Sequence, residues 1–242
     1  MRGPSYGGII GMSRIVDVGA TVSLLSQKGG VGKSGIVRVL AVEFSKAGWK
    51  VKIADLDTMQ GTSTKWKIRR DAAQLRPEIP VEKFATVERA IREAQNYDLL
   101  LIDGPAHADK GGLSMAKKSK LILMPTCYGL DDLEAQIEAA YELEANGIDR
   151  RRIWFVFCRT TGSPNEEEAA RAYLQRADIN VLGPVLPELP CIRQAHSGGK
   201  AASEVSFPVI RERAKALAVA VAMKLEEMTK IEAATKTKME AA

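Results

Sequence analysis

One stretch, SLLSQKGGVGKSG at residues 23–35, constrains the fold of this chain more than any other. An apolar run ends in a glycine-rich loop, and a helical pattern follows. Glycines let successive backbone N–H groups close around phosphate oxygens, a lysine neutralises phosphate charge, and the N-terminus of the next helix faces the anion. The sequence therefore predicts a phosphate-binding loop between a strand and a helix, with Lys33 placed between Gly32 and Ser34.

Short apolar runs alternate with helical patterns along the rest of the chain. The almost wholly apolar runs predict buried strands at 20–26, 50–55, 97–103, 120–125 and 152–158. Helical patterns are found at 34–47, 62–74, 86–95, 112–118, 130–146 and 165–177. Weaker patterns suggest further strands near 79–83 and 180–186. This alternation predicts an α/β fold, a doubly wound and mostly parallel β-sheet with helices on both faces.

The last segment, 208–240, carries apolar residues at spacings of three and four, which predicts a long helix that packs on the sheet. No linker or internal repeat divides the chain. We therefore expect one domain over 20–242 that follows a glycine-rich leader over 1–19.

The composition of the chain indicates what kind of partner it could bind and in which cellular compartment it would work. The net charge of +5 favours a polyanion such as nucleic acid, although a basic surface without a ligand would give the same value. Three distant cysteines, Cys127, Cys158 and Cys191, form no CxxC motif, which fits a reducing cytosol and argues against a cysteine-based zinc site. The sequence has no run of about 18 apolar residues, so we expect no transmembrane helix.

The glycine-rich loop departs from the pattern GxxxxGK[ST], because its first glycine would be Gln27. With its additional lysine, Lys28, the run KGGVGKS resembles the deviant Walker A loop of the ParA/MinD family of P-loop ATPases. In that family two subunits sandwich two ATP molecules, and the first lysine touches the partner's nucleotide. The resemblance implies an ATPase that forms a homodimer when it binds ATP.

Two further segments resemble motifs of the family. VKIADLDTMQGTSTKW (51–66) is similar to the DxDPQG segment, in which Asp57 matches the aspartate that positions or activates the attacking water. LLLIDGPAH (99–107) is similar to the Walker B strand, which ends at Asp103. The resemblance covers most of residues 20–225 in the expected order.

The resemblance implies two ligands, ATP and Mg²⁺. The residues implied to bind the nucleotide are Lys28, Gly29, Gly30, Val31, Gly32, Lys33, Ser34, Gly35 and Arg159. Those implied to hold Mg²⁺ are Ser34, Asp55 and Asp103. Those implied to be catalytic are Lys28, Lys33 and Asp57. Hydrolysis should be slow until a partner protein orders the site.

Three departures from the family pattern concern the tuning of hydrolysis rather than ATP binding. Thr58 replaces the usual proline after Asp57. Gly35 stands where a second hydroxyl residue often contacts phosphate. The loop after Asp103 reads Gly-Pro-Ala, which ends at Ala106.

Several features favour the branch of short ParA-type DNA-partition ATPases. Gln27 is typical of that branch. The C-terminal tail has no aromatic residue and mixes both charges, so it is a poor membrane anchor. The cysteine patterns of iron–sulfur carriers are missing, and residues 1–19 are too few for a helix-turn-helix domain.

Partition ATPases bind DNA without sequence preference, through basic residues near the C-terminal region. The segment 187–204 is similar to the family there. The implied DNA contacts are Arg193, Lys200, Arg211, Arg213 and Lys215. The alternative is a solvated helix face. His107 lies close to Asp103 in the sequence and fits a surface histidine of that loop better than a base, and His196 has no visible partner. Trp66 and Trp154 fit a core or an interface better than a ligand platform.

The resemblance thus implies a cytoplasmic, nucleoid-associated ATPase that partitions a plasmid or chromosome with a ParB-like adaptor. Two alternatives stay open. The same switch could position a conjugative DNA-transfer complex or a protein assembly, or the chain could be a metabolic ATP-dependent enzyme such as a dethiobiotin-synthetase-like ligase. Lys28 and the Asp57 segment speak against the metabolic enzyme.

Overall fold

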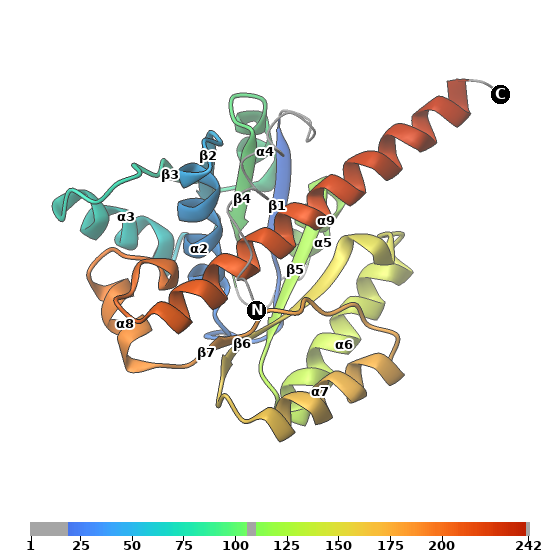
Figure 1. The fold of residues 1–242 in the computed structure, drawn as a ribbon. Helices are drawn as coiled ribbons and strands as arrows, with labels where there is room; N and C mark the ends of the chain where they lie inside the picture. Colours follow the sequence, from blue (N-terminus) through green and yellow to red (C-terminus); the bar gives the residue numbers. More distant parts are fainter. Residues whose placement is uncertain (1–18, 106–109, 241–242) are drawn as a thin grey trace.

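In the part of the chain that the structure describes, seven strands form one sheet in the order β3-β2-β4-β1-β5-β6-β7, and every neighbouring pair is parallel (Figure 1). The computed structural model describes residues 19–105 and 110–240. The strands are β1 (Ala20–Leu24), β2 (Val51–Asp55), β3 (Val81–Lys83), β4 (Leu99–Asp103), β5 (Leu121–Thr126), β6 (Ile153–Thr160) and β7 (Leu186–Pro187). The predicted doubly wound fold is confirmed, with a sheet that is parallel throughout.

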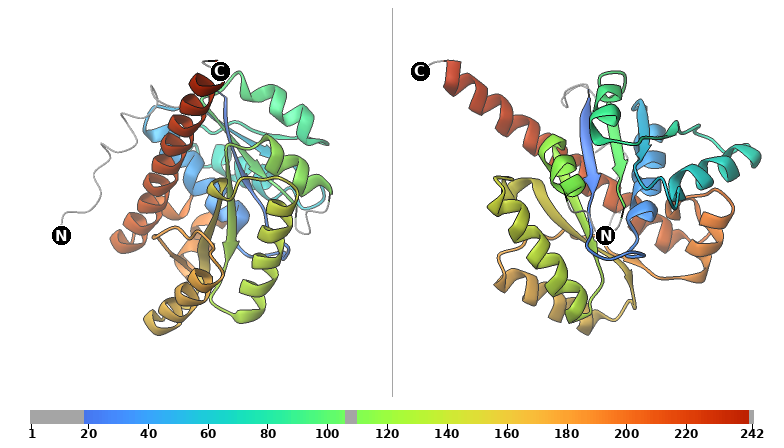
Figure 2. Two further views of the ribbon diagram at one scale, coloured as in Figure 1. Left: turned by 90° about the vertical axis from the view of Figure 1, so that its right-hand side faces the viewer. Right: turned by 180° about the vertical axis from the view of Figure 1, so that it is seen from behind.

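Helices cover both faces of this sheet (Figures 1 and 2). They are α2 (Lys33–Lys46), α3 (Thr62–Ala72), α4 (Val87–Ala94), α5 (Lys110–Lys118), α6 (Leu130–Ala145), α7 (Pro164–Arg176), α8 (Pro190–Ser197) and α9 (Pro208–Glu240). Short 3₁₀ helices lie at η2 (Arg150–Arg152) and η3 (Ala202–Glu204). The helices α2 and α9 pack on one face, and α4, α5, α6 and α7 pack on the other.

Alternation along the strands explains why the apolar runs are continuous. Leu99 and Leu101 of β4 point into the core beneath α2 and α9. Leu100 and Ile102 point into the core beneath the other helices. Because both faces are covered, every residue of β4 is buried.

The C-terminal region differs from the sequence-based expectation in two places. The weak strand expected over 180–186 is reduced to β7 and a single bridge between Val181 and Phe155. The short helix α8 was not predicted from the sequence. Its first turn carries Pro190, which suits a helix start, but eight residues are too few for a clear apolar period.

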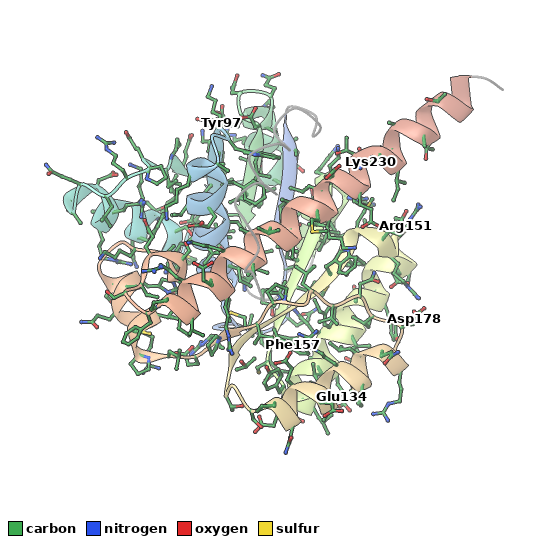
Figure 3. All side chains as sticks on the ribbon, in the orientation of Figure 1. Tyr97, Glu134, Arg151, Phe157, Asp178 and Lys230 are labelled. Atoms are coloured by element: carbon green, nitrogen blue, oxygen red, sulfur yellow. The ribbon has the colours of Figure 1, made fainter. Side chains whose placement is uncertain are left out.

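The long helix α9 crosses one face of the sheet and then continues beyond it (Figures 1 and 2). Its buried stripe runs from Ile210 to Met228. Close to the end of this stripe, the exposed side chain of Lys230 pairs with Glu226 at 2.6 Å (Figure 3). Within the described ranges, no helix is long and apolar enough to cross a membrane.

A buried arginine ties α3 to the segment before α9. The guanidinium of Arg70 is fully buried and donates to Glu204 through Nη1 at 2.8 Å and Nη2 at 3.1 Å. It also donates to the carbonyls of Gly199 and Pro77. Nearby, the indole N–H of Trp66 donates to the carbonyl of Lys200 at 3.1 Å. This network fixes the loop that leads from α8 into α9.

We expect Arg70→Met to lower the free energy of unfolding by about 3–5 kcal/mol, because it leaves Glu204 as an uncompensated, largely buried charge. Arg76→Ala is the matched control. Its ion pair with Glu78 is exposed on both sides, so its loss should change stability by about 1 kcal/mol or less. Urea denaturation measures both values, and equal stabilities of the two variants would contradict the role given to Arg70.

Candidate functional site

The glycine-rich loop lies at the carboxyl end of β1, the central strand, and leads directly into α2. Gly30 and Gly32 have φ values of +76° and +103°, a region that favours glycine. A Cβ on Gly32 would lie only 2.4 Å from Sγ of Cys158 on β6. No side chain caps the N-terminus of α2, so its first N–H groups are available to an anion. The predicted phosphate loop therefore has the required local geometry.

A cavity of about 430 Å³ opens above this loop. Its wall combines the loop with residues that follow β2 and with residues of β6, β7 and α8. The lining residues used below are Gly30, Lys33, Ser34, Gly35, Arg38, Asp57, Arg159, Glu188 and His196. Residues from five separate segments thus meet at the carboxyl edge of the sheet, where open α/β sheets bind ligands.

Lys33 supplies buried positive charge at the base of the cavity. Its residue is only 8% exposed, and burial lowers the pKa of its ammonium, while the nearby carboxylates of Asp103 and Asp57 oppose that shift. The ammonium is therefore held between the loop and two acids. A bound phosphate would offset the charge of Lys33 in the same place.

Two aspartates lie side by side beneath the cavity. Asp55 ends β2 and Asp103 ends β4, and the two are direct partners in the parallel register. Burial raises the pKa of Asp103, and the hydroxyls of Ser63 and Ser34 oppose the shift. The parallel register of β2 and β4 therefore brings these two carboxylates together.

The first turn of α3 binds one oxygen of each carboxylate. Ser63 Oγ donates to Oδ2 of Asp103 at 2.6 Å, and Thr64 donates to Oδ2 of Asp55 from its backbone N–H at 2.9 Å and its hydroxyl at 2.8 Å. The remaining Oδ1 atoms of Asp55 and Asp103 are buried without a hydrogen-bond partner among the described residues. Buried acceptors of this kind need a partner, and a cation would provide one.

The donor set fits Mg²⁺. Two carboxylates and the hydroxyl of Ser34 are hard oxygen ligands, and Mg²⁺ takes few protein ligands because it keeps waters and phosphate oxygens. The parts of the chain that the structure describes contain no group of three or more His, Cys, Asp or Glu residues that could hold a metal ion. A site of Ser34, Asp55 and Asp103 is consistent with this finding, since only two of its ligands are carboxylates.

Asp57 lies in the wall of the cavity, just past the end of β2. Its Oδ1 accepts from the backbone N–H of Gln60 at 3.0 Å, and its carbonyl accepts from that of Gly61 at 2.7 Å. These bonds close a tight turn, which leaves the second carboxylate oxygen without a protein partner among the described residues. A single free oxygen near the phosphate loop suits a group that orients water.

Lys28 does not line the cavity of its own chain. Its Nζ donates to Oδ1 of Asp132 at 2.7 Å and to the carbonyl of Asp131 at 3.1 Å, both at the start of α6. The hydrogen bond to Asp132 raises the pKa of Lys28. Hydrogen bonds from the Cys127 thiol and from Lys28 hold the pKa of Asp132 below its usual range. The two lysines of the loop therefore occupy different environments.

Arg159 bridges the loop to the far wall of the cavity. Its Nε donates to Glu188 at 2.7 Å, and its Nη1 donates to the carbonyl of Gly30. Its own φ of +56° is unusual for a residue with a side chain. The resemblance implied that this residue binds the nucleotide, and the structure places it in the cavity wall with its guanidinium on the phosphate loop.

Sequence reasoning missed two residues of the cavity. Arg38 lies one helical turn after Ser34, is buried, and donates to the carbonyl of Thr62 at 3.1 Å. Burial lowers its pKa to about 10. His196, taken from the sequence as a residue without a partner, lies in α8 with its ring beside Gly35. A charge inside the apolar run GIVRVLAV was the available signal for Arg38, whereas nothing local marked His196.

The candidate DNA contacts come from α8, from the start of α9 and from the segment between these two helices (Figure 1). Arg193 is exposed and pairs with Glu188 at 2.8 Å. Arg211 and Lys215 lie four residues apart on one side of α9, whereas Arg213 is rotated by about 200° from both. Lys200 is exposed in the loop between the two helices.

Other expectations have mixed outcomes. Trp66 is a core residue, as expected. Trp154 is partly buried against the core and stacks under Lys224, whose Nζ lies 4.0 Å from the ring centroid. Ala106 and His107 lie outside the described residues.

Together these features define a class of protein. A glycine-rich loop at the end of the central strand, a lysine and a hydroxyl at the start of the next helix, and an adjacent pair of buried carboxylates form the nucleotide site of a P-loop protein. The model of the family described as "CobQ/CobB/MinD/ParA nucleotide binding domain" matches residues 22–202, well over half of the chain. The chain therefore belongs to this family of nucleotide-binding ATPases, as its motifs predicted.

Individual relatives are distant. The chromosome-partitioning ATPase Soj of Thermus thermophilus is 25% identical over 215 residues, which span 74% of this chain and 85% of Soj. The cell division ATPase MinD of Pyrococcus furiosus superposes with a TM-score of 0.66 at 21% sequence identity. The superposition covers 84% of this chain and 98% of the MinD chain. Apo McdA of Cyanothece gives a TM-score of 0.67 at 15% sequence identity, and the superposition covers 84% of this chain and 99% of the McdA chain. The two structures establish the shared fold.

We expect Gly32→Ala to abolish measurable nucleotide binding, because its Cβ would collide with Cys158 and displace the loop. Gly147→Ala is the matched control, since Gly147 also has a positive φ of +85° but nothing within 4 Å of its Cβ. The control should lose about 1 kcal/mol of stability and keep its nucleotide affinity. Titration with a fluorescent ATP analogue measures the affinities, and normal binding by Gly32→Ala would contradict the geometry of the loop.

Proposed function

We propose that this chain is an ATPase that dimerises when it binds ATP and Mg²⁺, binds DNA without sequence preference as a dimer, and drives partition or positioning of a DNA cargo. The supporting observation is the position of Lys28. Its ammonium is bonded at the start of α6 while the rest of the loop surrounds the cavity. A lysine outside its own cavity is available to a second subunit.

The residues of the cavity divide the work on the nucleotide. The loop N–H groups and Lys33 bind the phosphates, and Ser34, Asp55 and Asp103 hold Mg²⁺. When bound, Mg²⁺ neutralises charge that develops on the phosphates. Asp57 orients the attacking water with its free oxygen. Because Lys28 is bonded to Asp132 and does not line the cavity of its own chain, the site is incomplete until a partner orders it, and we expect slow intrinsic hydrolysis.

Lys28 completes the site of the partner subunit in this proposal. To reach the partner's nucleotide it exchanges its bonds to Asp132 and Asp131 for bonds to phosphate oxygens. A lysine in that position acts as an arginine finger does, by offsetting negative charge on the departing phosphate. Dimerisation and ATP binding then become one event.

DNA binding follows from the basic residues around α8 and the start of α9. Each subunit offers exposed cations there, and a rigid dimer doubles them. ATP can shift the protein onto DNA only if the dimer binds DNA more tightly than the monomer does. Because α8 also forms one wall of the cavity, the nucleotide state can reach this surface through one short helix.

The remaining parts of the proposal concern the partner and the place. A ParB-like adaptor bound to the cargo stimulates hydrolysis and releases the dimer from DNA. The protein then works in the cytoplasm on the nucleoid, without a membrane anchor. The distant likeness to Soj, whose name records chromosome partitioning, supports this version over a metabolic enzyme of the same fold.

The decisive measurement is binding to non-specific duplex DNA with ATP–Mg²⁺, with ADP–Mg²⁺ and without nucleotide. We expect binding with ATP only, binding that persists in Asp57→Ala because hydrolysis is blocked, and loss of binding and of the dimer in Lys28→Ala. Lys230→Ala, which removes an exposed lysine in the C-terminal half of α9, is the control for loss of one positive charge. Light scattering reports the dimer in parallel.

Three results would redirect the proposal. DNA binding that is independent of nucleotide would remove the switch. A protein that binds ATP and dimerises yet never binds DNA would favour positioning of a protein assembly, and turnover of a small substrate would favour the metabolic alternative.

The five candidate cations can be ranked by salt dependence. Replacing a residue that contacts phosphate should weaken DNA binding and reduce the slope of log K against log salt by about 0.9. We expect this for Lys200→Ala and Arg213→Ala, which are exposed and have no ion pair among the described residues. Arg176→Ala on α7, a helix of the other face, should leave the slope unchanged. Equal slopes in all three variants would place the DNA surface elsewhere.

A further inference from the structure

His196 occupies a place in the cavity that the roles given above leave without a function. It belongs to α8, more than 160 residues along the chain from the phosphate loop, yet its ring lines the same cavity as Lys33 and Ser34. The ring lies against the first turn of α2, where Cε1 of His196 is 3.3 Å from the position that a Cβ of Gly35 would take. The imidazole therefore stands next to the backbone that follows Ser34.

The absence of a side chain at position 35 makes this approach possible. Gly35 lies within α2 and has no positive φ, so its backbone conformation admits any residue. A contact of 3.3 Å is tighter than ordinary van der Waals packing, so a larger residue would push the ring away. A side chain at position 35 and the ring of His196 would therefore compete for the same space, and the ring would have to shift to admit a residue larger than glycine.

The ring has hydrogen-bonding capacity that the protein does not use. Nε2 is buried without a partner, and no described residue bonds to Nδ1. A neutral imidazole carries one donor and one acceptor, and burying Nε2 without a partner is unfavourable. A ligand in the cavity would supply the missing partner.

The charges around the ring favour an anionic partner. Arg38 and Arg69 both act on His196 with positive charge, and only Glu188 opposes them. Burial, and to a smaller extent the positive charge of Arg38, lowers the pKa of His196 to about 4. The ring is therefore neutral at neutral pH and keeps a single N–H to donate. The N–H of His196 would therefore suit an oxygen atom of a phosphate or of the adjoining ribose as its acceptor.

We infer that His196 is a nucleotide-contacting residue, which donates a hydrogen bond to the α-phosphate or ribose end of the nucleotide from the space that Gly35 leaves open. It takes the place of a hydroxyl side chain at position 35. We assign the contact to the α-phosphate end of the nucleotide because of where Gly35 lies on α2. Gly35 comes after Lys33 and Ser34 on this helix and so lies farther from the terminal phosphate. The inference rests on the binding of ATP in this cavity.

A double-mutant cycle tests the shared space. His196→Ala should weaken both ATP and ADP binding by about tenfold to a hundredfold, the range for a lost hydrogen bond to a charged group. Gly35→Thr should also weaken binding, because it displaces the ring. In Gly35→Thr/His196→Ala the threonine hydroxyl has room, so the double variant should bind more tightly than His196→Ala alone. Calorimetric titration with ATP and with ADP measures every affinity.

Further variants separate contact from packing. His196→Gln keeps an N–H donor and should recover part of the affinity. Gln194→Ala, an exposed position on the same helix, should match the wild type. Thermal unfolding with and without ADP shows whether each variant is folded and how far the nucleotide stabilises it.

The outcomes discriminate cleanly. Equal affinities of His196→Ala and wild type, or a strictly additive cycle, would overturn the inference and leave ATP binding intact. A loss confined to ATP would also overturn it, because the contact would then be with the terminal phosphate. A wild-type protein that binds neither ATP nor ADP would overturn both this inference and the proposed function.

Discussion

The close contact between Gly32 and Cys158 is the constraint on which the site depends. The two residues belong to the loop after β1 and to β6, which are separated by β5 in the sheet. Only a glycine can pass the thiol at this distance, and burial raises the pKa of that thiol to about 12, so it behaves as an inert packing group. The contact fixes the loop against the wall that carries Arg159, and it thereby sets where Lys33 and the start of α2 point.

Charge in the cavity is arranged before any ligand arrives. Lys33 and Arg38 supply buried positive charge, while Asp55 and Asp103 each keep one buried oxygen without a partner among the described residues. The free energy for removing these groups from water is supplied by folding rather than by binding. A nucleotide and its cation therefore meet groups that are already desolvated and oriented, which is how preorganised sites gain affinity.

The helix α8 connects the cavity with the outer surface. On its inner side His196 faces Gly35, and on its outer side Arg193 pairs with Glu188, which itself lines the cavity. The ion network of Arg70 anchors the loop that follows α8. In the proposed function, these contiguous contacts would carry a change at the nucleotide to the basic residues near α9.

The sequence by itself determined the parallel α/β fold, the phosphate loop and the positions of Asp55, Asp57 and Asp103, because periodicity and loop chemistry are local and each motif lies within a short stretch of chain. It did not determine α8, which is too short for a clear period, nor the reduction of the 180–186 strand to a bridge and β7. Only the tertiary structure paired Lys28 with Asp132 and set His196 against Gly35. These contacts join residues more than 100 positions apart, and the packing of strands and helices decides which distant side chains meet.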